Sequence, residues 1–447
     1  MPRSHRLLLI AILLLAAALR FYCLDGQSFW NDEGNSVRLA QRSLALVTAG
    51  AAGDIHPPGY YYLLWAWIRL FGDSEFAARS LSVVMGLLLV AVTYALGRQF
   101  DRPALGLIAA FLSAISPFQV YYSQEARMYI LAALVGAAAT YVLVRMVSWE
   151  TGRLGGREMD GSSTRFTKLP ICQLTYVLLT AAGLYTHYSY PVVMAVHNAV
   201  YGLWLLMTWR RGQVGARLLR WVGLQLGVLI LYLPWLPVAW PRLIGYGAIS
   251  EAQSPGYILA QALRHYTLGP TAGETAWTSW FLTGYVVLTV VSLVRLFTIR
   301  NSQFATRNPQ LAIRFLPLLY ALAPIAMMVA LSFGRPAYRP KFFLVGTPAF
   351  HLILAHALLL FHPPRQLPTE PSNLPTFQLS NLYTAATLVF VTLTAIPSLY
   401  NYYHDPAHAR DDYRGMARYI KAVARDRDAV LLNAPNQWEV FTYYYGD

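Results

Sequence analysis

Residues 80–98 read SLSVVMGLLLVAVTYALGR, an apolar run with a single charged residue, Arg98, at its end. A helix of about 20 mostly apolar residues crosses the hydrocarbon core of a membrane. A single segment can satisfy all its backbone hydrogen bonds in that core only as a helix. The run therefore predicts a transmembrane helix.

Ten further apolar runs flank this one. Hydrophobic residues make up 56% of the 447 residues and charged residues 13%, against roughly a quarter charged in a soluble domain. This composition excludes an ordinary soluble enzyme and predicts one all-α polytopic bundle of about eleven spans. The other expected spans are 7–24, 104–120, 129–147, 170–186, 191–208, 221–240, 276–296, 314–333, 342–361 and 381–400.

The charge distribution predicts the orientation of the bundle. The formal net charge is +14, and its cations concentrate in alternate loops. Cytoplasmic loops are rich in Lys and Arg, so a cytoplasmic N-terminus is favoured and residues 401–447 lie outside. Membrane orientation accounts for these cations, and no nucleic-acid partner is expected. The basic loops are 98–103, 148–169, 209–220, 297–313 and 362–380.

The first run, 7–24, follows Arg3 and Arg6, as the apolar part of a signal peptide would. We interpret it as the first span, because the apolar stretch continues through residues 19–21 without a loop.

Two outer segments are unusual. The long aromatic loop 25–79 contains 33–47, which predicts an amphipathic surface helix, and 56–72, which predicts an interfacial helix rather than a twelfth crossing. After the last span, Asp412 can cap a helix, 429–433 is strand-like and 438–445 is helical in pattern. The chain thus divides into a transmembrane domain, 1–400, and an extracytoplasmic tail, 401–447, with the beginnings of an α/β unit.

Adjacent acids occur in the first outer loop, within Trp30-Asn31-Asp32-Glu33. A carboxylate at a membrane surface can serve as a general base. Asp32 is well placed to cap the surface helix, with Glu33 favourable in its first turn. From this motif alone, capping is the better interpretation.

Two further outer motifs carry ionisable groups. His56 precedes Pro57 and Pro58, which restrict the backbone and would aim the imidazole. Residues 121–129, YYSQEARMY, place Glu125, Arg127 and Tyr129 between two spans. Charges so close to hydrocarbon are costly unless paired or used. A helix-starting turn at 56–58 and an internal Glu125–Arg127 pair are the alternatives.

The outer loop before the tenth span is basic, with Arg335, Arg339 and Lys341. Cations on the outer face oppose the usual charge bias, and a phosphate group is their natural partner. Generic binding of lipid headgroups is the alternative. No closely spaced set of metal ligands appears, so no metal site is predicted and no cofactor is required, although a divalent metal remains open.

Together, the acidic pair, HPP at 56–58, QEARMY at 124–129 and the basic loop resemble the membrane-embedded type C glycosyltransferases. The resemblance is to the branch with protein O-mannosyltransferases and the aminoarabinose transferase, and it is densest over 25–147. The aminoarabinose transferases carry an acid-lysine pair before a single proline, where this chain has Ile55-His56. That departure argues against an aminoarabinose substrate.

The resemblance implies an enzyme that takes a sugar from a polyprenyl phosphate, on the non-cytoplasmic face of, we expect, a bacterial plasma membrane. It implies catalytic carboxylates at Asp32, Glu33 and Glu125, with Asp32 the base. A sugar phosphodiester needs no general acid to leave, so one carboxylate and several cations suffice. The cations and polar groups expected to bind the phosphate and substrate are His56, Arg127, Tyr129, Arg335, Arg339 and Lys341.

The sugar and the hydroxyl acceptor are not specified by the sequence. A lipid or solute transporter is the main alternative, but transporters place binding groups near the midplane, whereas the ionisable groups here cluster at the outer ends of the spans. A non-catalytic membrane scaffold, in which the acids only cap helices, is a third possibility.

The topology can be tested with single cysteines introduced at Asp54 and Asp160 in a chain whose Cys23 and Cys172 are replaced by serine. An impermeant thiol reagent added to intact cells should label position 54 and not position 160. Labelling of position 160 from outside would contradict the orientation.

Overall fold

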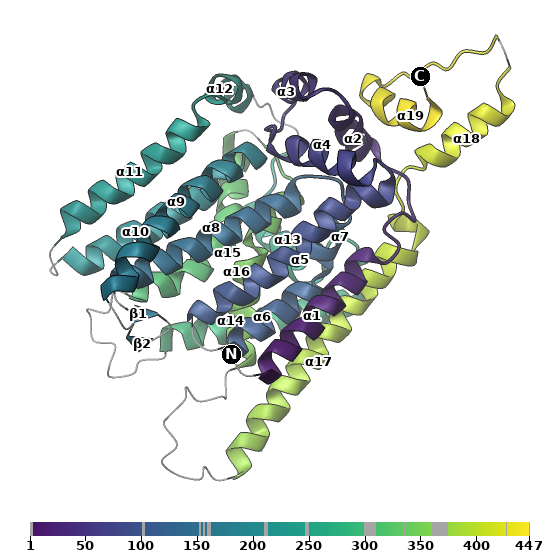
Figure 1. Cartoon of the computed structure of the whole chain (residues 1–447). Helices are drawn as coiled ribbons and strands as arrows, with labels where there is room; N and C mark the ends of the chain where they lie inside the picture. The colour runs from purple at the N-terminus through teal and green to yellow at the C-terminus, as the bar shows by residue number, and fades with distance from the viewer. Residues whose placement is uncertain are drawn as a thin grey trace.

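The computed structural model describes residues 3–100, 103–151, 153–154, 157–158, 162–209, 213–245, 250–298, 310–334, 336–359, 374–425 and 427–446. It is a helical bundle with further helices gathered at one end (Figure 1). The two short strands, β1 (Arg153–Leu154) and β2 (Arg157–Glu158), pair antiparallel.

Ten helical segments in the described part of the chain are long and apolar enough to span a membrane, or eleven if one bent pair counts as a span. The expected bundle of about eleven spans is therefore confirmed. The helices that contain these segments are α1 (Arg3–Phe21), α5 (Glu75–Phe100), α8 (Tyr129–Thr151), α9 (Ser162–Thr186), α10 (Pro191–Thr208), α11 (Val214–Tyr232), α14 (Ala276–Thr298), α15 (Gln310–Gly334), η2 (Pro340–Gly346) with α16 (Thr347–Leu358), and α17 (Leu374–His404).

The bent pair is α6 (Pro103–Ile115) and α7 (Pro117–Ser123), which meet at 59°. Pro117 has no N–H to continue the helix, so carbonyls of the preceding turn lose their usual partners. Arg20 of α1 supplies donors, from Nη1 to the carbonyl of Ala114 (2.8 Å) and from Nη2 to that of Ser113 (3.0 Å). The fully buried Arg20 thus supplies the hydrogen bonds that these carbonyl groups lack at the break.

The seventh span differs from the expected 221–240. Helix α11 ends at Tyr232, and α12 (Leu236–Ile244) follows as a separate short helix. Pro234, between the two, cannot donate to the helix ladder. The proline accounts for the end of the span at Tyr232, and the span begins at Val214, before the expected apolar run.

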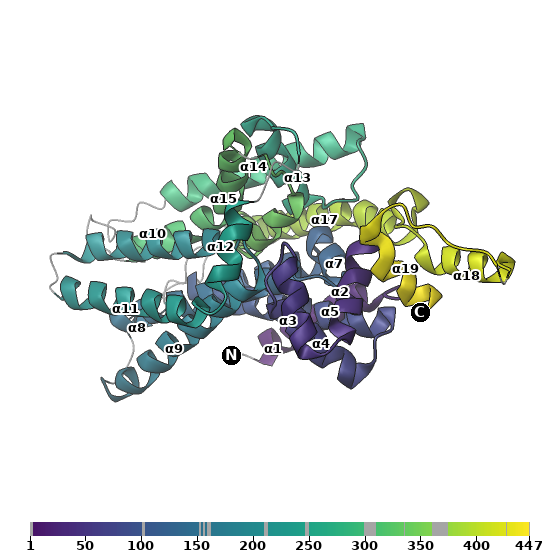
Figure 2. The same cartoon turned by 90° about the horizontal axis from the view of Figure 1, so that it is seen from above.

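The helices of the first loop, α2 (Asn31–Gln41), α3 (Leu44–Gly53) and α4 (Gly59–Phe71), lie side by side at one end of the bundle, next to α12 (Figures 1 and 2). Helix α13 (Pro255–Thr267) packs against η2, α15, α14 and α7. The expected helix over 56–72 is present as α4, whereas the one expected over 33–47 is wrong. The chain breaks at Arg42, whose carbonyl accepts from Trp65 Nε1 (3.1 Å) and Arg69 Nη2 (2.9 Å) of α4 instead of continuing a helix.

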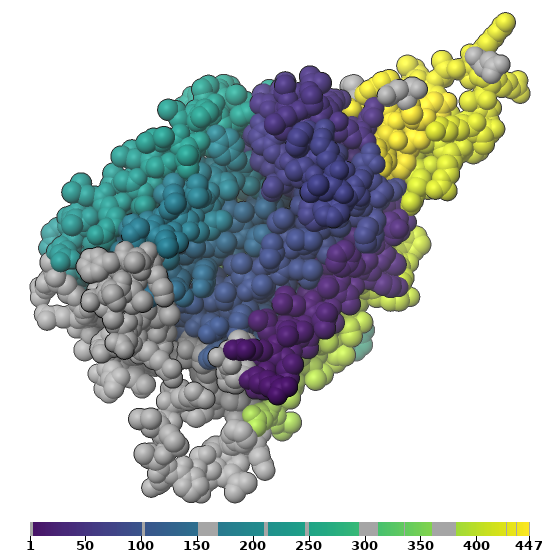
Figure 3. All heavy atoms as spheres, in the orientation of Figure 1, coloured from purple at the N-terminus to yellow at the C-terminus, as the bar shows by residue number. Residues whose placement is uncertain are grey.

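The tail leaves α17 through η3 (Pro406–His408), α18 (Tyr413–Val423), η4 (Pro435–Gln437) and α19 (Trp438–Tyr445). Asp412 caps α18 as expected, accepting from the N–H of Gly415 (2.8 Å). The strand expected over 429–433 is absent, and no second strand is available among the described tail residues to pair with it. The space-filling view shows the purple α2–α4 segment between teal α11–α12 and the yellow tail (Figure 3).

Candidate active site

Asp32 lies in the first turn of α2 but does not cap it. The helix begins at Asn31 after Trp30, which makes no side-chain cap. The Asp32 carboxylate instead approaches Arg127, with 3.5 Å between Oδ2 and Nη2, and the side chain is 31% exposed. The capping interpretation is therefore wrong, because the helix starts two residues too early for Asp32 to be its N-cap.

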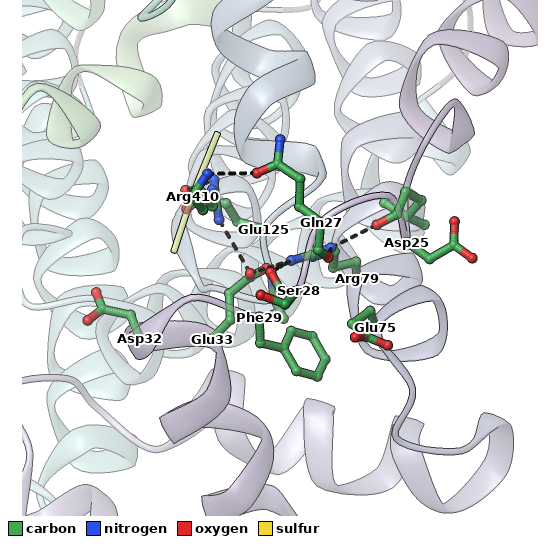
Figure 4. Close-up of polar contacts among 12 residues, drawn as sticks. Asp25, Gln27, Ser28, Phe29, Asp32, Glu33, Glu75, Arg79, Glu125 and Arg410 are labelled. Carbon is green, nitrogen blue, oxygen red and sulfur yellow. Dashed lines mark hydrogen bonds and ion pairs between the residues drawn. The ribbon is translucent and has the colours of Figure 1, made fainter. Parts of the chain in front are cut away.

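Glu33, the next residue, is fully buried and points to another side of α2 (Figure 4). Arg79 of α5 donates to both carboxylate oxygens, from Nε (2.9 Å) and Nη2 (2.7 Å), and the Ala126 N–H donates to Oε1 (2.8 Å). Burial alone would raise the pKa of Glu33, but Arg79 and Arg410 hold it below its ordinary value. Glu33 is thus an ionised anchor.

Arg79 organises the start of the first outer loop. Its remaining donors reach the carbonyls of Leu24 (2.9 Å), Gln27 (2.8 Å) and Ser28 (2.9 Å). All five N–H groups of a guanidinium can thereby be used in one place. Sequence reasoning missed Arg79, because it lies within the first turns of an apolar span and carries no motif.

Arg410, in the tail, joins the two buried acids. Its Nη1 donates to Glu33 Oε2 (3.3 Å) and its Nη2 to Glu125 Oε1 (2.6 Å). Sequence reasoning missed this residue too. The available signal was an arginine just after the last span, on the face where the orientation rule disfavours cations.

Glu125 is buried on the loop between α7 and α8. Its Oε2 has no hydrogen-bond partner within the described part of the chain. Burial raises the pKa of Glu125, and the Glu33 carboxylate raises it further, against the opposing charge of Arg410. Glu125 is thus held by one guanidinium and is easier to protonate than an ordinary glutamate.

Arg127 is the cation nearest to Asp32. Besides the carboxylate, it donates to the Asp32 carbonyl (3.1 Å) and to Ser36 Oγ (2.8 Å) through Nη1. The internal Glu125–Arg127 pair considered from the sequence is not among the ion pairs of the described residues. Arg127 instead turns toward α2.

His56 is oriented by a carboxylate. Its Nδ1 lies 3.4 Å from Asp54 Oδ2, which also accepts from Tyr61 Oη (2.6 Å). Burial lowers the pKa of His56, and Arg127 and Lys341 lower it further, against the effect of Asp54. The imidazole is therefore neutral near pH 7. His187, a residue without a sequence signal, packs 5.7 Å from it between ring centroids.

The basic loop contributes two described cations. Lys341 Nζ lies 4.6 Å from the centroid of the Tyr129 ring, and Arg339 is exposed. Tyr129 is buried. Arg335 lies outside the described residues.

These groups surround a cavity of about 780 Å³ between the first outer loop, α12, η2 and the tail. Of the predicted site residues, Asp32, His56, Arg127, Arg339 and Lys341 line it. Glu33, Glu125 and Tyr129 are not among its lining residues and are buried. The Asp32 carboxylate therefore shares the cavity with several cations, and Asp54 and Glu439, its other acidic lining residues, are paired with His56 and Arg42.

Metal ligands do not gather in this region. Within the described residues, no three His, Cys, Asp or Glu side chains lie close enough together to hold an ion. Cationic side chains outnumber acidic ones among the residues that line the cavity. Their positive charge disfavours a bound metal ion electrostatically.

Removing the Glu33 charge should leave Arg79 buried with too little negative charge around it. We expect Glu33→Gln to lower the free energy of unfolding by about 3–5 kcal/mol, as for other broken buried ion pairs. Glu274→Gln, which changes an 85% exposed side chain paired with Arg264, should cost at most about 1 kcal/mol. Thermal unfolding in detergent compares the two, and equal losses would contradict the anchoring role.

A family model described as dolichyl-phosphate-mannose-protein mannosyltransferase matches residues 55–155. This range contains both the HPP and the QEARMY motifs. A comparison with curated proteins gave no significant match.

Solved structures share the fold over nearly the whole chain. ArnT from Cupriavidus metallidurans in the apo state is 14% identical, with a TM-score of 0.61 over 98% of this chain and 84% of that one. Bound to undecaprenyl phosphate, it is 15% identical, with a TM-score of 0.55 over 100% and 85%.

The oligosaccharyltransferase AglB from Archaeoglobus fulgidus, in complex with an inhibitory peptide and a dolichol-phosphate, is 13% identical, with a TM-score of 0.57 over 99% of this chain and 59% of that one. The chain therefore has the fold of these membrane proteins, and its resemblance to the membrane-embedded type C glycosyltransferases is confirmed.

Proposed function

We propose that the protein is a membrane glycosyltransferase that moves a sugar from a polyprenyl-phosphate donor to an acceptor hydroxyl on the extracytoplasmic face. The observation that carries the proposal is the cavity, in which the Asp32 carboxylate stands among Arg127, Arg339 and Lys341. The outer position of these residues rests on the charge bias of the loops. The undecaprenyl phosphate and dolichol-phosphate found in the relatives support a lipid-phosphate donor.

The reaction assigned to the cavity is a single displacement. The acceptor oxygen bonds to the anomeric carbon as the bond from that carbon to the phosphate oxygen breaks, and its electron pair leaves with the lipid phosphate. Asp32 takes the acceptor proton, acting as general base. Attack opposite the leaving phosphate inverts the anomeric centre.

The cations stabilise the charge that develops on the leaving phosphate. Lys341 and Arg127 are the more buried donors, so their interactions with phosphate are less screened by water than those of Arg339. His56, held by Asp54, presents a neutral imidazole to the same cavity. It is suited to hydrogen-bond a sugar or acceptor hydroxyl.

Glu33 and Glu125 have a different part in this scheme. Both are buried behind the cavity wall and bound by guanidinium groups. We assign them to holding α2 and the loop 124–128, which carry Asp32 and Arg127. Asp32 is then the one carboxylate of the three with access to the acceptor.

Asp32→Asn tests the base directly. The amide keeps the shape of the side chain but cannot take a proton, so we expect transfer to fall by about 100-fold or more while folding is retained. The assay measures sugar transfer from a synthetic polyprenyl-phosphate sugar to an acceptor found by mass spectrometry of glycans with and without the protein. Asp25→Asn, an exposed residue of the same loop, is the matched control. Near-wild-type transfer by a folded Asp32→Asn protein would rule out this mechanism.

The cations can be ranked by donor binding. Lys341→Met should weaken polyprenyl-phosphate binding by about 1.5–3 kcal/mol, as expected for a charge-assisted hydrogen bond. The exposed Arg339 should contribute about 1 kcal/mol or less when changed to Gln. Binding is measured by fluorescence titration in nanodiscs, with Arg418→Gln on α18 as control. Unchanged affinity in both cavity variants would argue against a phosphate site here.

A further inference from the structure

The tail returns to the first outer loop at a buried point. Arg410, whose side chain is only 12% exposed, contacts Glu33 and Glu125 at once. Its guanidinium also lies over the rings of Trp30 (5.3 Å) and Tyr121 (5.2 Å), and its backbone N–H donates to Gln27 Oε1 (3.0 Å). The side chain is therefore fixed from several directions.

The acids that Arg410 joins belong to the two segments that carry the reacting groups. Glu33 follows Asp32 in the same turn of α2, and Glu125 lies two residues before Arg127. Arg410 is not among the residues lining the main cavity, and no described contact joins it to Asp32. It can act on the base only by setting where these segments lie.

The tail has a second contact with α2, through α19. Gly34 faces Val440 so closely that a Cβ at position 34 would overlap the Val440 side chain. Glu439 pairs with Arg42 at the end of α2 and lines the cavity. The Tyr444 hydroxyl accepts from the Phe29 N–H (2.7 Å) just before α2. The tail thus packs on α2 and contributes Glu439 to the lining of the cavity.

We propose that Arg410 is a positioning residue for the transfer reaction, and that residues 405–446 are part of the active site. Arg410 bridges Glu33 and Glu125 and so holds Asp32 and Arg127 beside each other at the cavity. Helix α19 holds α2 from the other side through Gly34. The expected effect of Arg410 on turnover rests on the proposed glycosyl transfer. Its expected effect on the position of α2 does not.

Geometry distinguishes positioning from simple charge neutralisation. A guanidinium presents a planar fork that can bind two carboxylates, whereas an ammonium is a compact point charge. If Arg410 only neutralised charge, Arg410→Lys would keep full activity, and so would a variant that loses the charges of Arg410 and Glu125 together. If Arg410 positions the two segments, neither variant should be fully active. Small misplacements of a reacting group can cost about 100-fold in rate.

The test compares Arg410→Lys, Arg410→Met and Arg410→Met/Glu125→Gln. We expect kcat to fall by about 10- to 100-fold in Arg410→Met, with the donor KM within about threefold of wild type. Arg410→Lys should recover part of kcat, and the double variant little of it. Arg414→Lys is the matched control, because Arg414 lies four residues further along and pairs with Glu75 rather than with the two bridged acids.

Wild-type kcat in folded Arg410→Met, or full recovery in the double variant, would overturn the proposal. So would a raised KM with unchanged kcat, which would make Arg410 a donor-binding residue. If Arg410→Met does not fold, Arg410→Lys and Gly34→Val decide. Gly34→Val should displace α19 and lower kcat, and wild-type kcat in both variants would overturn the proposal.

Hydrogen exchange provides a readout that needs no activity. Amides of α2 and α19 should exchange faster in Arg410→Lys than in wild type or Arg414→Lys. Unchanged exchange in both helices would overturn the positioning role. A wild-type protein inactive with every polyprenyl-phosphate sugar would instead refute the proposed function, while exchange would still decide what Arg410 does.

Discussion

The buried ion pairs of Glu33 determine how the outer part of the molecule is assembled. A carboxylate with no access to water is tolerated only when paired and hydrogen-bonded. Glu33 meets this condition through Arg79 on a spanning helix, the Ala126 N–H and Arg410 on the tail. The first loop, the second loop and the tail therefore meet at one side chain, and the cavity lies beside that point.

The same requirement operates within the bundle at Arg20. A bent span in hydrocarbon leaves carbonyls without partners, and the bilayer offers no water to replace them. The Arg20 guanidinium reaches Ser113, Ala114 and Ser123 at the bend of α6 and α7. One buried cation thus permits α7 to turn and deliver the loop 124–128 to the outer end, where Glu125 and Arg127 are needed.

The bundle could be predicted well from the sequence, because runs such as 80–98 report local hydropathy and each span is a local structure. Helix α19 and the Asp412 cap followed from equally local patterns. The break after α2 did not, since it depends on Trp65 and Arg69 in another helix. Arg79 and Arg410 were missed for the same reason. Each acts through a buried ion pair with a carboxylate far away in the sequence, and neither lies in a recognisable motif.

The Glu33–Arg410 contact joins residues 377 positions apart, which has a consequence for biosynthesis. Spans enter the membrane in the order in which they are translated, so the first and second outer loops cross long before Arg410 is made. During that interval Glu33 and Glu125 lack the guanidinium that bridges them in the complete chain. Arrival of the tail would then complete the cavity, so a ribosome-bound chain that has not reached residue 410 should be an inert precursor.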